Sequence, residues 1–293
     1  MKPVEVSDRS VLEPLLLAAN PTTCECNFPN MYVWGLVYKT RWTLFNGRVC
    51  SHLEVDDELL YPLGGNGFPS AEEMLEISNA MRRAGFNGAF RQVPEEFLKA
   101  RPEILKSFSA EQVPEAVGEY LYSVERLANL PGSKLAKKKN LLSQFKRACP
   151  DFKAKALAPE DLPACIELVK DWRREKVSGL PLELEHEAVA LDAAFEHFSE
   201  LGLEGIAAYA SGRLVAFSMF SRVSDKMYTE HFEKADASVK GAAQFINNET
   251  AKALLGKCEL LNREQDMGLD GLRQAKRSYA PIGLVRNYSL MPL

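Results

Sequence analysis

The chain lacks a long apolar run, an export signal and an excess of charge of either sign. A helix that crosses a bilayer needs roughly 18 consecutive apolar residues, and the longest apolar stretches, Val11–Ala19 and Leu214–Phe220, are too short and are expected in a core. Met1–Glu5 lack the basic-then-apolar order of a signal peptide. With 36 Lys and Arg against 40 Asp and Glu, the net charge is −4. A surface that binds nucleic acid all over is therefore excluded, and any polyanion site must be a local patch.

Cysteine is sparse, and several catalytic signatures are missing. The six cysteines are scattered, which indicates reduced thiols and a cytoplasmic protein. Cys24, Cys26, Cys50 and His52 have the residue types of a zinc site. One-residue spacings are unusual for zinc, so no metal is predicted, and binding by these four stays open. No Gly-x-Ser-x-Gly, Walker or His-Glu-x-x-His motif occurs, so serine hydrolase, ATPase and zinc protease functions have no support.

Helix and strand patterns alternate along the chain, which predicts a mixed α/β class. The Asn46-Gly47 pair is a strong hairpin signal between two strands. The elements expected over residues 1–150 are helices at Ser7–Ala19, Pro69–Ala84, from Pro94, and Ser133–Ala148, and strands at Met31–Lys39, Trp42–Phe45, Arg48–Val55, Glu58–Leu63 and Tyr120–Val124.

After Cys149-Pro150, residues 151–293 begin a new and regular succession of strand and helix patterns. The strands expected there are Lys153–Leu157, Glu204–Ala210, Arg213–Arg222, Lys226–Glu233, Glu259–Asn262 and Gly283–Ser289, and the helices are Pro159–Lys176, Glu185–Gly202, Ser238–Leu255 and Leu269–Tyr279. This is the element order of a GNAT acyltransferase domain. The first half has similar ingredients, although no residue-level repeat is visible. We therefore expect mixed α+β sheets in two tandem GNAT-like acyltransferase domains, at residues 1–150 and 151–293.

The stretch Asn262–Tyr279 places charged and amide groups just after a strand, where ligands bind in open α/β sheets. Lys276 interrupts an apolar stripe on the following helix, which is costly unless its charge meets an anion or a carboxylate. Glu264 and Asp266 are neighbouring carboxylates that could pair with it. The alternative is that the stem of Lys276 packs while its head reaches solvent.

Two further clusters could carry chemistry. Near the end of the Lys226–Glu233 strand, His231 is a candidate general base, or else a structural histidine. Lys240 and Gly241 then open a helix whose N-terminus could hold the pyrophosphate of an acyl donor, although the usual glycine-rich run is absent. The Ser133–Ala148 helix is strongly basic; its lysines form either a solvated face or a footprint for tRNA, coenzyme A or lipid headgroups.

A family resemblance rests on Glu119–Ser123, Lys138–Asn140, His231–Ala235, Asn262–Gly268 and Leu272–Pro281. With these residues the chain resembles the soluble bacterial relatives of the phosphatidylglycerol lysyltransferase C-terminal domain, a tandem GNAT family. The resemblance spans nearly the whole chain. It implies transfer chemistry: membrane-anchored members move an aminoacyl group from a charged tRNA onto a lipid headgroup, and related tandem GNAT proteins use acyl donors.

We therefore expect a cytoplasmic transferase that moves an acyl or aminoacyl group from aminoacyl-tRNA or acyl-CoA to an amine or hydroxyl, with no tightly bound cofactor. Glu264 or His231 is the expected base, and Tyr279 a proton donor. The residues expected to bind the donor or substrate are Lys276, Arg263, Asn262, Asp266, Lys240, Gly241, Lys138, Lys139 and Asn140. No integral membrane association is expected, and the lysines leave weak peripheral contact with anionic lipid open. The alternative is a non-catalytic GNAT-fold module that binds tRNA or an anionic metabolite.

Overall fold

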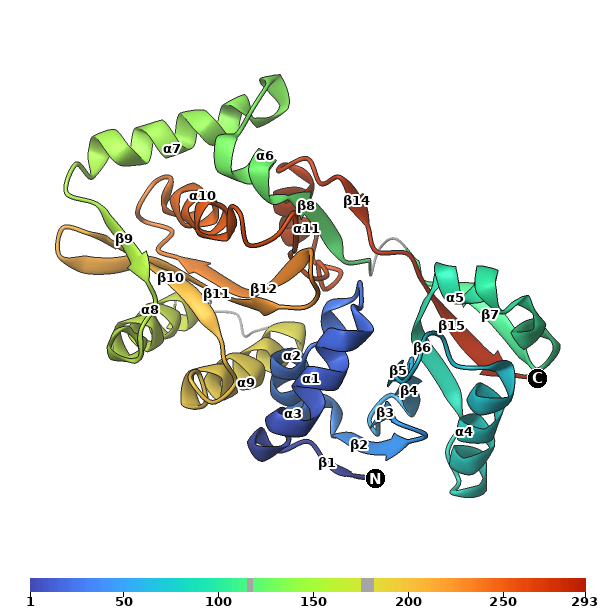
Figure 1. Cartoon of the computed structure of the whole chain (residues 1–293). Coiled ribbons are helices and arrows are strands. Elements are labelled where there is room, and N and C mark those ends of the chain that lie inside the picture. The colour runs from blue at the N-terminus through green and yellow to red at the C-terminus, as the bar shows by residue number, and fades with distance from the viewer. Residues whose placement is uncertain (115–117, 175–181) are drawn as a thin grey trace. The chain divides into compact units, whose positions relative to one another are not determined.

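The computed structural model describes residues 1–114, 118–174 and 182–293 (Figure 1). It divides into two compact units: unit 1 comprises Met1–Gly118 and Val285–Leu293, and unit 2 comprises Glu119–Leu284. The division differs from the boundary expected at residue 150. Cys149-Pro150 only ends a helix, because the preceding segments from Glu119 onward pack into unit 2.

Unit 1 is built on one mixed sheet with the strand order β1-β2-β3-β4-β6-β15-β7, and β5 pairs with β3 (Figure 1). Its strands are β1 Lys2–Pro3, β2 Thr40–Phe45, β3 Arg48–Leu53, β4 Glu58–Leu60, β5 Leu63–Gly64, β6 Ala89–Pro94, β7 Phe108–Gln112 and β15 Asn287–Pro292. Its α-helices are α1 Arg9–Ala19, α2 Phe28–Val33, α3 Gly35–Tyr38, α4 Ala71–Arg83 and α5 Glu95–Ala100. The β2–β3 hairpin around Asn46-Gly47 is confirmed.

The strand expected at Met31–Lys39 is wrong, because this segment forms α2 and α3. The Asn27 side chain accepts a hydrogen bond from the Asn30 amide, and Pro29 lies in the first turn of α2. An asparagine cap and an early proline start a helix whatever the β propensity of the residues that follow. Strands β1, β6 and β7 are not among those expected from the sequence.

Unit 2 contains a seven-stranded sheet in the order β14-β8-β13-β12-β11-β10-β9. Its strands are β8 Tyr120–Ser123, β9 Lys153–Ala156, β10 Glu204–Ala210, β11 Arg213–Arg222, β12 Met227–Ala235, β13 Leu260–Asn262 and β14 Gly283–Leu284. Its α-helices are α6 Val124–Asn129, α7 Ala136–Ala148, α8 Leu162–Arg174, α9 Leu182–Glu196, α10 Ala242–Leu254 and α11 Asp270–Arg277. From β9 onward this is the predicted order.

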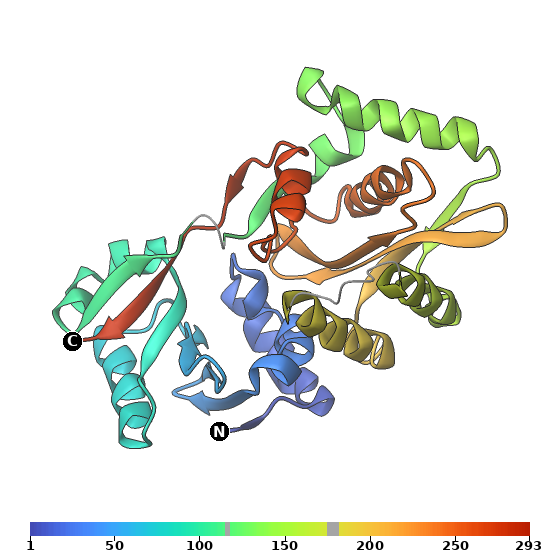
Figure 2. The same ribbon diagram turned by 180° about the vertical axis from the view of Figure 1, so that it is seen from behind.

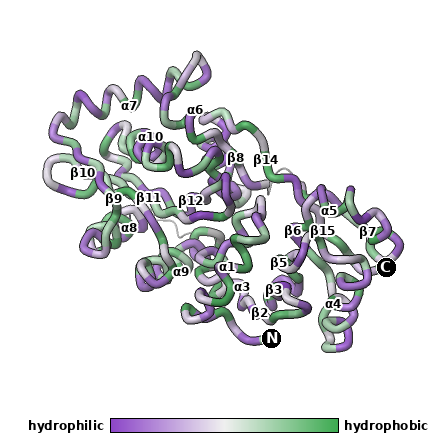
Figure 3. The backbone as a smooth tube through the Cα atoms, viewed as in Figure 1, coloured by the Kyte–Doolittle hydropathy of each residue, from purple (hydrophilic) through white to green (hydrophobic). Residues whose placement is uncertain are grey.

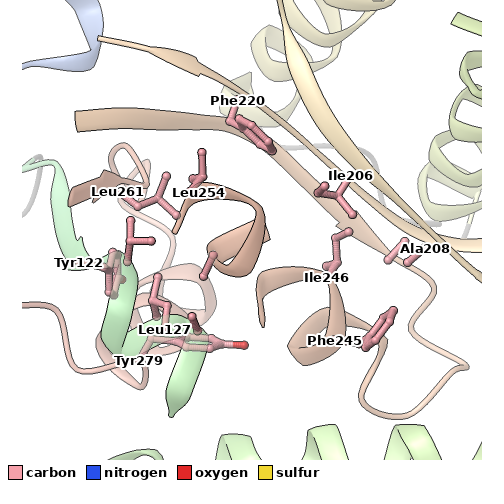
Figure 4. Packing of buried hydrophobic residues seen from close by; sticks show 14 of the residues in the cluster. Tyr122, Leu127, Ile206, Ala208, Phe220, Phe245, Ile246, Leu254, Leu261 and Tyr279 are labelled. Carbon is pink, nitrogen blue, oxygen red and sulfur yellow. The ribbon is translucent and has the colours of Figure 1, made fainter. Parts of the chain in front are cut away.

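The core of unit 2 lies between its sheet and α10. Phe220 from β11 and Leu261 from β13 belong to one hydrophobic cluster with Ile246 and Leu254 of α10 (Figure 4). Helices α6 and α7 contact α10, whereas α8 contacts β11 and β12 from the other face of the sheet (Figures 1 and 2). Hydrophilic residues run along much of α7 (Figure 3).

Strands β12 and β13 diverge in the middle of the sheet after a short stretch of pairing. They pair in parallel only at Met227–Leu260, Tyr228–Leu261 and Thr229–Asn262, while β12 continues to Ala235. The β11–β12 register shifts so that Phe220 faces Glu230 and Met219 faces Phe232. His231 is therefore the extra residue of a β-bulge, a feature that re-aims a side chain.

No helix in residues 1–114, 118–174 and 182–293 combines the length and the hydropathy that crossing a membrane requires.

Candidate functional site

Side chains, rather than backbone hydrogen bonds, join β12 to the segment after β13. Arg263 donates from Nε to Glu230, and from Nη2 to Glu233 Oε2 at 3.0 Å. His231 Nδ1 lies 3.0 Å from Glu264 Oε1. We call this group, together with Ser221, the β12–β13 site. The structure thus brings together two of the expected catalytic residues, His231 and Glu264.

His231 is held at both ring nitrogens. Its Nε2 lies 2.8 Å from Ser221 Oγ of β11, and its Nδ1 faces Glu264. When Glu264 is ionised it can only accept, so a neutral imidazole then donates from Nδ1 to Glu264 and accepts from the Ser221 hydroxyl at Nε2. The order hydroxyl, imidazole, carboxylate is the arrangement with which proteins make histidine a base. The sequence reasoning missed Ser221; a polar residue within the apolar run of β11 was its only signal.

The backbone of Glu264 is held in an uncommon conformation. Its φ is 56°, in the left-handed region, which costs a non-glycine residue of order 1–3 kcal/mol. The Glu264 amide donates to Asn262 Oδ1 at 2.8 Å, and the Glu264 carbonyl accepts from the Tyr120 amide at 3.1 Å. Asn262 also donates to Glu119. Asn262 is therefore buried among protein groups and positions Glu264.

The Arg263 cluster combines opposite charges in a buried setting. Burial would lower the pKa of Arg263, but Glu230 and Glu233 outweigh it and raise the pKa. Burial raises the pKa of Glu230 to about 7, against the pull of Arg263. In the described part of the chain, three buried atoms here have no hydrogen-bond partner: Thr229 Oγ1, Glu230 Oε1 and Asn247 Oδ1. Buried polar groups are normally paired, so the cluster retains unused hydrogen-bonding capacity.

Tyr279 and Lys138 border the same cluster. The Arg263 guanidinium carbon lies 5.4 Å from the centre of the Tyr279 ring, and Lys138 Nζ lies 4.1 Å from it. Burial raises the pKa of Tyr279, so its hydroxyl stays protonated at neutral pH. Burial, helped by Arg263, lowers the pKa of Lys138. The neighbouring Lys139 and Asn140 are exposed on α7.

Lys276 is buried rather than extended into solvent, and its ammonium group donates to the carbonyls of Arg263 and Gln265, the latter at 2.7 Å. It therefore fastens α11 to the turn that carries the site. Asp266 accepts from Tyr120 Oη at 2.8 Å and from Arg273 Nε at 2.9 Å. Burial would raise the pKa of Asp266, but these hydrogen bonds outweigh it and lower the pKa.

The space above Gly241 is occupied by α7. Gly241 has φ 87° at the N-terminus of α10, and an added Cβ would lie 2.5 Å from the Leu141 carbonyl oxygen and 2.9 Å from Phe145 Cβ. The glycine thus admits a neighbouring helix. This differs from the expectation that it lets a pyrophosphate approach the backbone. Lys240, beside it, is exposed.

The four zinc candidates lie in unit 1 and do not assemble. His52 Nε2 faces Asp57 Oδ1 at 3.1 Å, and burial raises the pKa of Cys50 to about 12. Across the described ranges of the chain, no group of three or more His, Cys, Asp or Glu residues is placed to hold a metal ion.

Comparison with known proteins identifies the family. The family model for the C-terminal region of phosphatidylglycerol lysyltransferase matches residues 19–291, so the chain belongs to this family and the resemblance is confirmed. A conserved protein of unknown function from Bacteroides thetaiotaomicron superimposes with a TM-score of 0.90 at 24% identity, covering 100% of this chain and 99% of that one. L-PGS from Bacillus licheniformis gives a TM-score of 0.69 at 14% identity, covering 99% and 92%.

These likenesses, with the two sheets, show the predicted fold class: two tandem GNAT-like domains of mixed α/β structure. Among curated proteins, the uncharacterized MYCGA3080 of Mycoplasmoides gallisepticum is 22% identical over 188 residues, 63% of this chain. The matched region spans 59% of that relative's length.

Proposed function

We propose that unit 2 transfers an acyl or aminoacyl group from an anionic donor to an amine or hydroxyl, with His231 as the general base. The observation that carries the proposal is the position of His231: it lies at a β-bulge, where two strands part, between a carboxylate and a hydroxyl. General bases of this kind contribute about 10²- to 10⁴-fold to rate. Membership of the phosphatidylglycerol lysyltransferase family supports transfer as the reaction class.

The chemistry follows from the hydrogen bonds of His231. The nucleophile attacks the carbonyl carbon of the donor ester or thioester while its proton passes to Nε2, directly or through the Ser221 hydroxyl. Glu264 stabilises the imidazolium that forms. The tetrahedral intermediate then collapses, the bond to the leaving oxygen or sulfur breaks, and His231 returns the proton to that atom. Tyr279 is a protonated hydroxyl that can hydrogen-bond a developing negative charge.

Aminoacyl-tRNA is the donor that the structure favours over acyl-CoA. Helix α7 covers the N-terminus of α10, where a coenzyme A pyrophosphate was expected. The same helix carries exposed lysines such as Lys137 and Lys139, which suit a polyanion. Arg263 is committed to Glu230 and Glu233, so Lys138 is the better candidate for contact with the donor. Because charged tRNA is a cytoplasmic substrate, this donor would place the proposed reaction in the cytoplasm.

The test is transfer activity of His231→Gln, measured with aminoacyl-tRNA and with acyl-CoA against a panel of amines and hydroxyls. We expect a loss of about 10²- to 10⁴-fold in kcat with unchanged tRNA affinity, because the variant removes the proposed base and keeps a polar side chain in its place. The matched control is His197→Gln, since His197 bonds Glu200 at the end of α9 and lies outside the site. Equal activity of wild type and His231→Gln would refute the assignment.

The second candidate function is a non-catalytic module that binds tRNA or an anionic metabolite. It is favoured by the burial of Ser221 and His231, which are only 4% and 7% exposed. Wild-type protein that binds tRNA with a steep salt dependence, yet turns over none of the donors, would support this reading.

A further inference from the structure

A cavity lies wholly within unit 1, and none of the residues that line it belongs to the β12–β13 site. It has a volume of about 420 Å³ and is lined by the end of α1 and the turn after it, by β3 and β6, and by the loop from β4 to α4. A water molecule occupies about 30 Å³ of liquid, and small-molecule sites begin at about 300 Å³. The cavity is therefore large enough for a small organic ligand.

Arg48 places a rigid guanidinium group on the wall of this cavity, where its side chain is only 6% exposed. Nη1 donates to the carbonyls of Gly64 and Gly67, the latter at 2.9 Å, and Nε faces Glu73 Oε1 at 3.4 Å. None of these hydrogen bonds uses Arg48 Nη2. An added Cβ at Gly65 would lie 3.1 Å from Arg48 Cζ, so this glycine lets the guanidinium lie flat against the loop.

The charge of Arg48 is only partly balanced. Glu73 is its acidic partner, but Glu73 Oε2 accepts the Ser70 amide at 2.8 Å as part of the helix cap of α4. The long contact to Arg48 therefore uses the other oxygen of a carboxylate already engaged. Glu96 also lines the cavity, but it is exposed and its charge is solvated.

Tyr61 supplies a second, independent feature. It is 4% exposed, lines the cavity, and its hydroxyl has no hydrogen-bond partner in residues 1–114, 118–174 and 182–293. Burial raises the pKa of Tyr61, so the hydroxyl is a hydrogen-bond donor at neutral pH. Its ring is fixed against Phe97, with centroids 5.2 Å apart. An unsatisfied buried hydroxyl is unfavourable, and a ligand oxygen would relieve it.

We propose that this cavity binds a small amphipathic acid whose anionic oxygens accept from Arg48 and Tyr61. The Arg48 guanidinium can only donate hydrogen bonds, and the unpaired Tyr61 hydroxyl is available to donate one. Two such donors select an anionic oxygen group such as a carboxylate or a phosphate. The remaining wall includes Pro62, Leu63 and Phe68, which suits a compact apolar body. The inference is independent of the proposed transfer reaction in unit 2.

The experiment uses the full-length protein and Tyr61→Phe, which removes one oxygen and leaves the ring in place. Hexanoate supplies the carboxylate, inorganic phosphate the phosphate, and hexanol the same apolar chain without charge; binding is measured by calorimetry and thermal shift at millimolar concentration. We expect an anion to bind wild type more tightly than hexanol does, and Tyr61→Phe to weaken it about ten- to hundredfold. The matched control is Tyr288→Phe, since Tyr288 lies on β15 and outside the cavity lining.

The unliganded variant provides a check on folding. Tyr61→Phe removes an unpaired hydroxyl, so its melting temperature should equal or exceed that of wild type. The proposal is overturned if neither hexanoate nor phosphate binds, if hexanol binds as tightly as hexanoate, or if Tyr61→Phe binds the anion as wild type does. Preference for hexanoate or for phosphate identifies which anionic group the cavity takes.

Discussion

Within the β12–β13 site, the role of each residue is decided by its partners. Arg263 and Lys276 are the cations expected to hold a donor, yet one serves two carboxylates and the other two backbone carbonyls. Both are fully engaged in holding the turn after β13 to its surroundings. His231 differs, because its Nε2 meets a hydroxyl that can exchange a proton. His231 therefore contacts a group with which it can exchange a proton, whereas Arg263 and Lys276 make contacts that hold the turn in place.

The pH dependence of stability should report on Glu230. Burial raises its pKa from 4.5 to about 7, so the folded chain holds this proton more tightly than the unfolded chain. Such a group stabilises the fold below its unfolded pKa, and the contribution is lost as pH rises from about 4.5 through about 7. The melting temperature of wild type, relative to that of Glu230→Gln, should therefore fall across this range.

The control for that titration is Glu259→Gln, because Glu259 is exposed and its carboxylate pairs with Lys226, which is also exposed. The difference in melting temperature between Glu259→Gln and wild type should be the same at every pH. A constant difference between wild type and Glu230→Gln would show that Glu230 does not change protonation between these pH values.

The sequence could single out His231, Glu264 and Arg263 as candidate site residues, but it could not show which side chains they contact. Glu264 lies 33 residues from His231, and Ser221 lies 10 residues before it on another strand. The contacts of His231 with Glu264 and Ser221 depend on a β-bulge and on strand register. The bulge and the register are both fixed by tertiary packing, which a local residue pattern does not reveal.

Lys276 links helix α11 to the turn that follows β13. Replacing it with Ala would remove the ammonium donor from the part-buried carbonyls of Arg263 and Gln265, and each such lost hydrogen bond costs about 1–3 kcal/mol. We expect Lys276→Ala to unfold at lower denaturant concentration, by about 2–4 kcal/mol in the free energy of unfolding. Lys252→Ala is the control, since Lys252 makes a surface ion pair with Glu249 worth about 0–1 kcal/mol. Equal stability of the two variants would contradict this structural role of Lys276.

Helices α7 and α10 depend on glycine at their closest approach. Gly241→Ala places a Cβ 2.5 Å from the Leu141 carbonyl oxygen and also strains a backbone at φ 87°. We expect a loss of about 2–4 kcal/mol in unfolding free energy, the sum of overpacking and strain. The control is Gly256→Ala, where φ is 77° and nothing lies within 4 Å of the added atom. The difference between the two measures the helix contact alone, and no difference would exclude it.

Elements with strong local signals were predictable from the sequence, and elements defined by distant partners were not. The helix at Ala71–Arg83 has a complete capping box between Ser70 and Glu73, and the basic helix ends before Pro150. By contrast, β6 was missed because its pairing with β4 and β15 comes from remote parts of the chain. The strand expected at Gly283–Ser289 is split between β14 and β15, which belong to different sheets.

The chain's C-terminal strand completes the sheet of its N-terminal unit. Strand β15 lies between β6 and β7, pairing Asn287 with Pro94 and Tyr288 with Gln112 (Figure 2). Leu290 is fully buried there. Unit 2 is one continuous segment, Glu119–Leu284, inserted between the two pieces of unit 1. Unit 1 therefore cannot complete its sheet until Asn287–Pro292 have been synthesised.

This arrangement predicts different behaviour for the two units when each is expressed alone. Residues 119–284 should fold by themselves, with cooperative thermal unfolding followed by circular dichroism, because their sheet and core are complete. Residues 1–118 should lack cooperative unfolding, since β6 and β7 lose the strand between them and β7 is left without a pairing partner. A synthetic peptide of residues 285–293 should restore the transition, whereas the same peptide with Leu290→Asp should not, because it would bury an unpaired charge. Cooperative unfolding of residues 1–118 without any peptide would show that β15 is dispensable to unit 1.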